Sequence, residues 1–142
     1  MKHVIALDVG GTGMKAALIA GDGTLLHEAR RATGRERGAD AVVETILDFA
    51  AELLDLGRDR FAAAASAAGV AVPGIVDAER GIAVYAANLG WRDVPLRELL
   101  AARLGGVPVA LGHDVRTGGL AEGSIGAGRG TDRFLFVTLG TG

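Results

Sequence analysis

Short apolar runs that end at glycines alternate along this chain with segments of helical periodicity, and this alternation is the strongest constraint on the fold. Three runs come first, over residues 4–9, 15–20 and 25–32, and the glycine-containing segments 10–13 and 21–23 join them. Connections of this kind favour hairpins, so the runs are predicted to be three consecutive antiparallel strands. Strands mixed with helices predict an α/β architecture rather than a helical bundle or a β-sandwich.

The segment from 40 to about 56 has the period of an amphipathic helix. Its apolar residues recur at three- and four-residue steps, and acidic side chains occupy the other face. The alanine-rich segment 61–68 does not distinguish helix from strand, but residues 69–72 are predicted to form a buried strand that ends in the Pro73-Gly74 turn. Residues 75–86 are predicted to form a small hairpin.

The same alternation continues to the end of the chain. A second helix is predicted over residues 95–104, with Asp93 as its N-cap. A short strand over 107–111, a helix over 115–126 and a last strand over 134–139 follow. The helix over 115–126 contains four glycines, each of which costs about 0.8–1 kcal/mol relative to alanine, so it is expected to pack closely against a neighbour.

Composition and charge limit the classes of function. The chain has 142 residues, 49% of them hydrophobic, which is enough for one domain with a real core. Its net charge is −2 without a basic block, so no direct contact with nucleic acid is expected. It has no cysteine and no metal-like histidine spacing, so no zinc site is expected. Without a signal sequence or a run near the ~18 apolar residues of a membrane span, a soluble, cytoplasmic protein with no membrane contact is expected.

The turn after the first strand, Asp8-Val9-Gly10-Gly11-Thr12, is a candidate phosphate loop. Asp8 falls where the strand stops, and Gly10 and Gly11 can adopt positive φ and let a phosphate approach main-chain N–H groups closely. Thr12 adds a hydroxyl. The same residues also suit a plain β-hairpin turn, so this motif alone leaves both interpretations open.

A carboxylate follows the predicted strand over 107–111. Open α/β sheets bind ligands at the carboxyl edge of their strands, and Asp114 is placed there to accept a proton from a substrate hydroxyl. An aspartate directly before a helix is also a common N-cap, which is the alternative. The segment 137–142 repeats the outline of the first loop, and two such loops facing each other could hold a polyphosphate; a plain glycine-rich turn is the alternative.

One more segment, Tyr85 to Trp91, has side chains suited to a sugar. Asn88 offers a donor and an acceptor to hydroxyl groups, and Trp91 offers an apolar ring surface. A loop amide and a core tryptophan explain these residues equally well.

Taken together, these segments resemble the ROK family, the bacterial sugar kinases and related repressors of the actin-like ATPase superfamily. Five segments follow the family order and cover essentially the whole chain: the phosphate motif 8–12, the sugar-side strand and turn 69–74, the loop and helix start 88–96, the pair His113-Asp114, and the opening of a second phosphate motif at 139–142. The resemblance implies a ribonuclease H-like, actin-like ATPase lobe in which flanking helices cover a mixed sheet with three leading antiparallel strands.

The resemblance also implies a function, the transfer of a phosphoryl group from ATP to a hexose or N-acyl hexosamine, as in a glucokinase. Asp114 would be the catalytic base, and Asp8 would hold Mg²⁺ directly or through water. Phosphate or ATP contacts would come from Asp8, Gly10, Gly11, Thr12, Thr138, Gly140, Thr141 and Gly142. Sugar contacts would come from Pro73, Gly74, Asn88 and His113.

The chain departs from the family pattern at two positions. Gly13 stands where the family usually has lysine, and no basic role carries over to Lys15. His113 replaces the usual asparagine beside the base, and an imidazole is bulkier and titrates near neutrality, so sugar choice and pH dependence stay open. A strand-end histidine that simply satisfies its own hydrogen bonds is the alternative.

Family members also continue into a second lobe with further sugar contacts, a Cys-rich zinc site and the adenosine pocket. Residues 1–142 are therefore expected to form a single N-terminal lobe, with little kinase activity alone and a tendency to form homodimers or self-associate. Two other functions stay open: a sugar-sensing module of a ROK-type transcriptional regulator, and a non-catalytic relic. A preceding DNA-binding segment would favour the first, whereas the presence of both Asp8 and Asp114 argues against the second.

Overall fold

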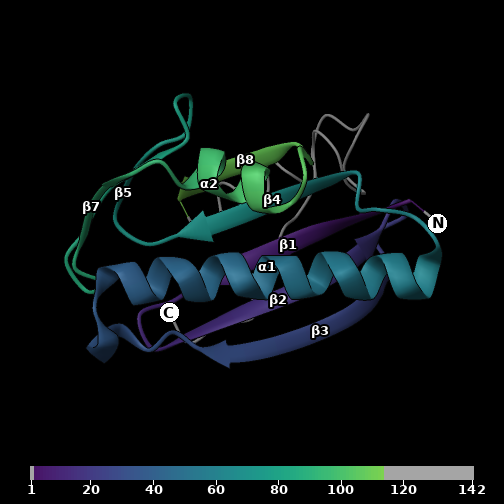
Figure 1. Ribbon diagram of the computed structural model, residues 1–142, viewed down its shortest axis with the longest axis horizontal. Helices are drawn as coiled ribbons and strands as arrows, with labels where there is room; N and C mark the ends of the chain where they lie inside the picture. The colour runs from purple at the N-terminus through teal and green to yellow at the C-terminus, as the bar shows by residue number, and fades with distance from the viewer. Residues whose placement is uncertain (1, 114–142) are drawn as a thin grey trace.

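The computed structural model describes residues 2–113, which form two sheets and two α-helices (Figure 1). The helices cover one face of a five-stranded sheet, and a three-stranded sheet lies at the end where β4 stops. The helix predicted over 115–126 and the strand predicted over 134–139 lie outside the described residues. The expected α/β architecture is confirmed.

The larger sheet is mixed, and its strands lie in the order β3-β2-β1-β4-β8. The strands are β1 (His3–Val9), β2 (Gly13–Ala20), β3 (Leu25–Ala32), β4 (Ala67–Val72) and β8 (Val109–His113). As predicted, β2 pairs antiparallel with both β1 and β3. Strands β4 and β8 run parallel to β1. The carboxyl ends of β1, β4 and β8 therefore meet at one edge of the sheet, which is where ligands bind in many α/β proteins.

The long helix α1 (Ala39–Phe61) lies along this sheet (Figure 1). Its apolar positions form the core with the inward-facing side chains of β1 and β2, and they include Val42, Ile46, Leu47, Ala50, Leu53 and Leu54. The predicted end of this helix near residue 56 is wrong, because the helix continues through Gly57 to Phe61. Gly57 weakens the helical pattern in the sequence, but in the structure it packs closely against His3, where a Cβ on Gly57 would overlap the ring. No helix within residues 2–113 is both long enough and apolar enough to cross a membrane.

The smaller sheet contains β5 (Ile75–Asp77), β6 (Ile82–Ala86) and β7 (Trp91–Val94), in that order. The hairpin predicted over 75–86 is confirmed, and Gly81 closes its turn with a φ of 73° and an N–H that donates to the Asp77 carbonyl at 2.8 Å. The sequence did not predict β7, which is only four residues long and pairs with β6. Trp91 within it is fully buried and belongs to the core.

The second helix, α2 (Leu96–Arg103), begins directly after Pro95. The prediction of Asp93 as its N-cap is wrong, because β7 still pairs with β6 at Val94 and the chain becomes helical only after Pro95. Asp93 instead lies within the strand with a φ of 53°.

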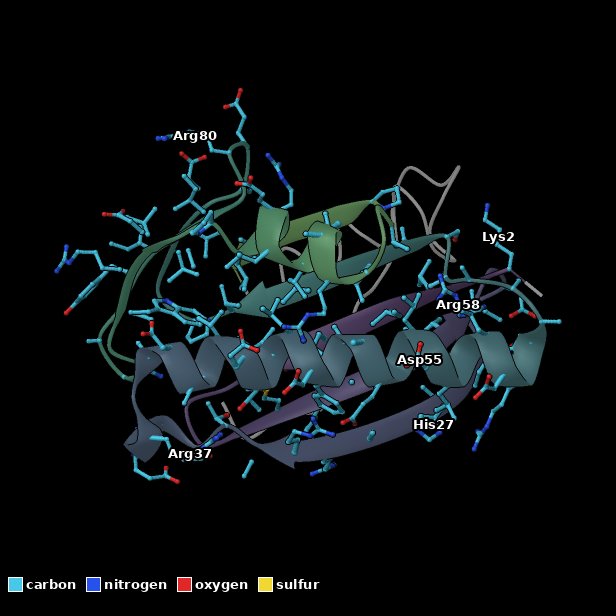
Figure 2. The ribbon with its side chains drawn as sticks, viewed as in Figure 1. Lys2, His27, Arg37, Asp55, Arg58 and Arg80 are labelled. Carbon is cyan, nitrogen blue, oxygen red and sulfur yellow. The ribbon has the colours of Figure 1, made fainter. Side chains whose placement is uncertain are left out.

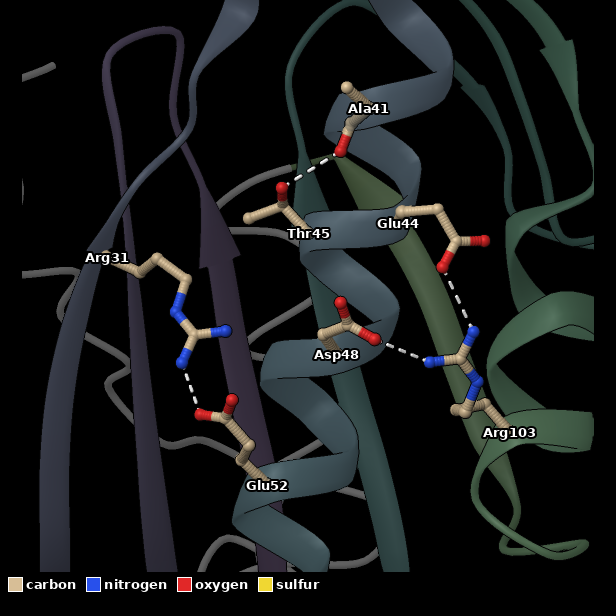
Figure 3. A network of polar contacts seen from close by, with 7 residues as sticks. All are labelled: Arg31, Ala41, Glu44, Thr45, Asp48, Glu52 and Arg103. Atoms are coloured by element: carbon tan, nitrogen blue, oxygen red, sulfur yellow. Dashed lines mark hydrogen bonds and ion pairs between the residues drawn. The ribbon is translucent and has the colours of Figure 1, made fainter.

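Exposed ion pairs tie α1 to its neighbours (Figure 3). Arg103 of α2 donates to Asp48 at 2.7 Å and to Glu44 at 3.1 Å, and Arg31 of β3 pairs with Glu52. These carboxylates lie on the polar face that the sequence predicted for this helix. They hold secondary-structure elements together at the surface, where such pairs contribute little to stability.

Candidate functional site

The loop between β1 and β2 is a tight turn that is held in position by Thr33, the residue that follows β3. The Gly10 N–H donates to the Gly13 carbonyl at 2.9 Å and closes the turn. The Thr33 hydroxyl donates to the Gly10 carbonyl at 2.7 Å, and the Thr33 N–H donates to the Thr12 carbonyl at 3.0 Å. Thr33 is completely buried, so two carbonyls of the loop are bonded to the interior of the protein.

This arrangement leaves the tip of the loop with two consecutive donors. Within residues 2–113, the N–H groups of Gly11 and Thr12 make no hydrogen bond. Gly11 is half-buried and Thr12 is exposed. Successive backbone N–H groups at a turn can form an anion-binding concavity, and these two N–H groups are the donors that the predicted phosphate loop would use.

The structure gives a different reason for the two glycines than the sequence suggested. Neither Gly10 nor Gly11 has a positive φ. A Cβ on Gly10 would instead lie 2.7 Å from the Gly13 carbonyl oxygen, and a Cβ on Gly11 would lie 2.9 Å from Asn88 Nδ2. Gly10 is therefore required because a backbone carbonyl approaches it closely, whereas a side chain at residue 11 would displace the end of the exposed Asn88 side chain.

Asn88 and Arg35 come from different parts of the chain and lie beside Gly11. Asn88 is exposed in the turn after β6, and Arg35 is exposed in the short helix η1 (Arg35–Arg37) that precedes α1. The Arg35 Nη1 atom is 3.8 Å from the position of a Cβ on Gly11. An amide and a guanidinium group thus border the space in front of the loop tip.

The Pro73-Gly74 turn joins the same region through β6. Gly74 has a φ of 83°, and a Cβ on it would lie 2.9 Å from the Ala86 Cα, two residues before Asn88. The first loop, the Pro73-Gly74 turn and Asn88, which the sequence singled out separately, are therefore brought together at one end of the protein.

Asp8 and His113 lie at the same edge of the larger sheet. Asp8 is half-buried and lies in register with Lys15 on β2 and Ala71 on β4. His113 is the last residue of β8 and pairs with Val72 of β4. Because neighbouring strands lie about 4.8 Å apart, the backbones of β1 and β8 are roughly 10 Å apart, with β4 between them. Five other predicted site residues, Asp114, Thr138, Gly140, Thr141 and Gly142, lie outside the described residues.

The sequence did not indicate that Thr33 and Arg35 lie beside the first loop, because residues 33–38 are predicted only to be a loop. The topology itself provides a signal for Thr33. Because β3 is antiparallel to β2 and Ala32 pairs with Gly13, the next residue must lie beside the loop at the start of β2. No comparable local signal identifies Arg35, whose position depends on how η1 packs.

The donor set at this edge fits magnesium better than zinc. Within residues 2–113 no three His, Cys, Asp or Glu side chains are close enough together to hold a metal ion. Mg²⁺ is commonly held by one or two carboxylates together with water and the phosphates of a nucleotide. Asp8, one carboxylate at the end of β1 beside a loop with unbonded N–H groups, fits that chemistry.

The fold and this edge define an α/β protein with the actin-like ATPase fold, in which a glycine loop follows the first strand of a mixed sheet. The chain belongs to the ROK family, because the model of that family matches residues 4–142.

Relatives of known function or structure agree with this assignment. The glucokinase of Thermotoga maritima is 36% identical over 140 residues, which are 98% of this chain and 42% of the glucokinase. The crystal structure of a ROK family glucokinase from Streptomyces griseus in complex with glucose and AMPPNP has a TM-score of 0.68 and 27% identity, over 90% of this chain and 38% of that one.

A transcriptional regulator has the same fold. The structure of a ROK family regulator, a homologue of the E. coli MLC protein, has a TM-score of 0.72 over 85% of this chain and 30% of the regulator, with 20% identity. This likeness concerns the fold alone. The chain spans less than half the length of each of these three proteins.

Proposed function

We propose that this chain is the N-terminal lobe of an ATP-dependent kinase that phosphorylates a hexose or an N-acyl hexosamine. The observation that carries the proposal is the loop tip, where the N–H groups of Gly11 and Thr12 make no hydrogen bond within residues 2–113 and Asn88 lies alongside. Similarity to glucokinases supports the sugar substrate, and the AMPPNP bound to one of them supports ATP as the donor.

The phosphates of ATP would bind between two loops. The N–H groups of Gly11 and Thr12 would donate to phosphate oxygens from one side, while Gly10 holds the turn closed. Thr138, Gly140, Thr141 and Gly142 would form the opposing loop. Asp8 would hold Mg²⁺, which would neutralise charge on the phosphate oxygens when bound.

The reaction is a direct transfer of the γ-phosphoryl group. A hydroxyl oxygen of the sugar attacks the γ-phosphorus, and the bond between that phosphorus and the oxygen bridging it to the β-phosphate breaks. ADP leaves with that electron pair, and the hydroxyl proton passes to the carboxylate of Asp114. Since the transition state spreads negative charge over the transferred group, the donors at the loop tip provide the main stabilisation.

The sugar would be held on the other side of the loop. Asn88 has a donor and an acceptor for its hydroxyl groups, and the Pro73-Gly74 turn lies beside the segment that leads to Asn88. His113, at the end of β8, would complete this side.

We further propose that the kinase needs a second lobe. The chain covers 42% of the length of the T. maritima glucokinase, and kinases that close two lobes over their substrates require both. Alone, the chain is expected to have little activity and to self-associate or form homodimers, because apolar surface that the second lobe would cover would be exposed. A cytoplasmic location would supply the ATP.

The test is sugar-dependent ADP formation with Mg-ATP, measured across glucose, fructose, mannose and their N-acetyl amines. It is run on this chain and on the natural full-length polypeptide that contains it. Turnover by the full-length polypeptide, and none by the chain alone, is the expected result. Asp114→Asn is expected to lower kcat by more than about a thousandfold while sugar affinity stays within about twofold. Activity equal to wild type in that variant would refute the role of Asp114.

A sugar-sensing module of a regulator is the second candidate, because a ROK regulator has the same fold and the fold therefore does not distinguish a sensor from a kinase. It predicts that the full-length polypeptide binds a sugar without forming ADP. The same assay, combined with calorimetric sugar binding, separates the two functions.

A further inference from the structure

Arg35 is a cation that lies near the loop tip. Among residues 2–113 it takes part in no ion pair or hydrogen bond through its side chain. Arg37, two residues later in η1, is used differently: its guanidinium folds over Gly34 and donates to the Thr45 hydroxyl at 2.8 Å. Of these two neighbouring arginines, Arg37 is bonded to α1, whereas Arg35 is available to a ligand.

Donor groups from two other parts of the described chain lie near Arg35. Its Nη1 atom and Asn88 Nδ2 border the space in front of Gly11, at 3.8 and 2.9 Å from the position of a Cβ there. The N–H groups of Gly11 and Thr12 are unbonded beside them. These donors predict an anionic ligand, because successive backbone N–H groups at a turn form an anion-binding concavity and the guanidinium group of Arg35 adds a positive charge beside it.

The loop itself provides no positive charge. Residues 8–13 include no lysine or arginine, although the group that a kinase transfers carries negative charge on each of its outer oxygens. Arg35 lies near both the loop and the proposed sugar-binding Asn88, and the transferred group would pass through this region from donor to acceptor. The planar guanidinium also matches the geometry of phosphate oxygens.

We propose that Arg35 binds the γ-phosphoryl group of the nucleotide during its transfer, and that it provides the positive charge that the first loop lacks. This inference rests on the proposed function. It assigns Arg35 to the transferred group and not to the α- and β-phosphates or to the sugar, since Arg35 lies at the tip of the loop and on the side of Asn88.

The test compares two nucleotides that differ in the γ-phosphoryl group. Affinities for Mg-AMPPNP, Mg-ADP and glucose are measured by calorimetry on the full-length polypeptide and its Arg35→Ala variant. Loss of a charge-assisted hydrogen bond is expected to weaken AMPPNP binding about 10- to 100-fold and to leave ADP and glucose within about twofold. Arg35→Lys, which keeps the charge but not the fork of donors, is expected to recover part of the loss.

Arg58→Ala is the matched control. Arg58 is also an exposed arginine without an ion pair within residues 2–113. It lies in the last turn of α1, whereas η1 precedes the first turn, and Figure 2 shows Arg37 of η1 and Arg58 at opposite ends of the helix. Its removal is expected to change none of the three affinities. A thermal unfolding midpoint unchanged in Arg35→Ala would show that the variant is folded.

Four outcomes would overturn the inference. Equal losses for AMPPNP and ADP would place Arg35 on another phosphate, and weaker glucose binding would place it on the sugar. Unchanged affinities in Arg35→Ala, with a wild-type protein that binds AMPPNP, would reject the inference alone. A wild-type protein that binds neither nucleotide would instead reject the proposed function, and the role of Arg35 with it.

Discussion

Replacing Thr33 with valine tests whether a single buried hydroxyl orients the phosphate loop. Valine keeps the branched shape and the backbone N–H that donates to Thr12, and it removes only the hydroxyl that donates to the Gly10 carbonyl at 2.7 Å. The expected results are a moderate loss of stability and a loss of nucleotide affinity.

The magnitude follows from the surroundings of the bond. A neutral hydrogen bond contributes about 0.5–1.5 kcal/mol to folding, and an acceptor left buried without a partner raises the cost to about 1–3 kcal/mol. Gly10 is half-buried, so water reaches its carbonyl in part, and the free energy of unfolding is expected to fall by about 1–2 kcal/mol. The loop without this hydrogen bond would have to become ordered when it binds phosphate. A cost of about 1–2 kcal/mol for that ordering corresponds to an AMPPNP affinity about 5- to 30-fold weaker.

Urea unfolding and calorimetric AMPPNP titration of the full-length polypeptide measure the two quantities. Thr33→Ser keeps the hydroxyl and is expected to bind AMPPNP like wild type. Ser66→Ala is the control, because the Ser66 hydroxyl donates to the His3 carbonyl at 3.1 Å, at the start of β1 and away from the loop. A Thr33→Val protein that is less stable but binds AMPPNP normally would refute the idea that this hydroxyl orients the loop.

Two further predictions concern the framework of the fold. Gly57→Ala raises helix propensity by about 0.8–1 kcal/mol, but its methyl group would lie 2.4 Å from the fully buried His3 ring, and overpacking costs about 1–3 kcal/mol. Urea unfolding is therefore expected to show a free energy of unfolding that is lower by up to about 2 kcal/mol. In a His3→Ala background the same substitution is expected to raise the free energy of unfolding by about 1 kcal/mol. A higher free energy of unfolding in the wild-type background would contradict the packing argument. Arg103→Ala removes both ion pairs between α2 and α1, and because these groups are exposed it is expected to lower the unfolding midpoint by no more than about 2–3 °C at low salt and by less at 1 M salt. A larger, salt-independent loss would mean that the aliphatic stem of Arg103, and not its charge, stabilises the contact.

Much of the fold could be predicted because its elements have local causes. The β3 bounds agree with the predicted strand, and the acidic face of α1 lies where the period put it, since alternation and helical periodicity depend on near neighbours in the sequence. The errors occur where a distant contact overrides a local pattern. Gly57 did not end α1, because His3 packs against it, and pairing with β6 kept Asp93 in a strand instead of at a helix N-cap.

The candidate site divides in the same way. Its motifs were visible individually, since Asp8, the two glycines of the first loop, Gly74 and Asn88 stand next to recognisable turns. Their role in one site was inferred from resemblance, because no local pattern relates residue 11 to residue 88.

The sequence by itself determined most of the strands and helices, and where the chain turns at a strand end with a carboxylate and two glycines. Only the tertiary structure decided that Thr33 bonds the Gly10 carbonyl and that Arg35 and Asn88 lie beside Gly11. The physical reason is that backbone preferences act over a few residues, whereas these contacts depend on strand order and register. Strand order and register are set by burial of the apolar faces of all the strands and helices together, and no single segment can specify that burial.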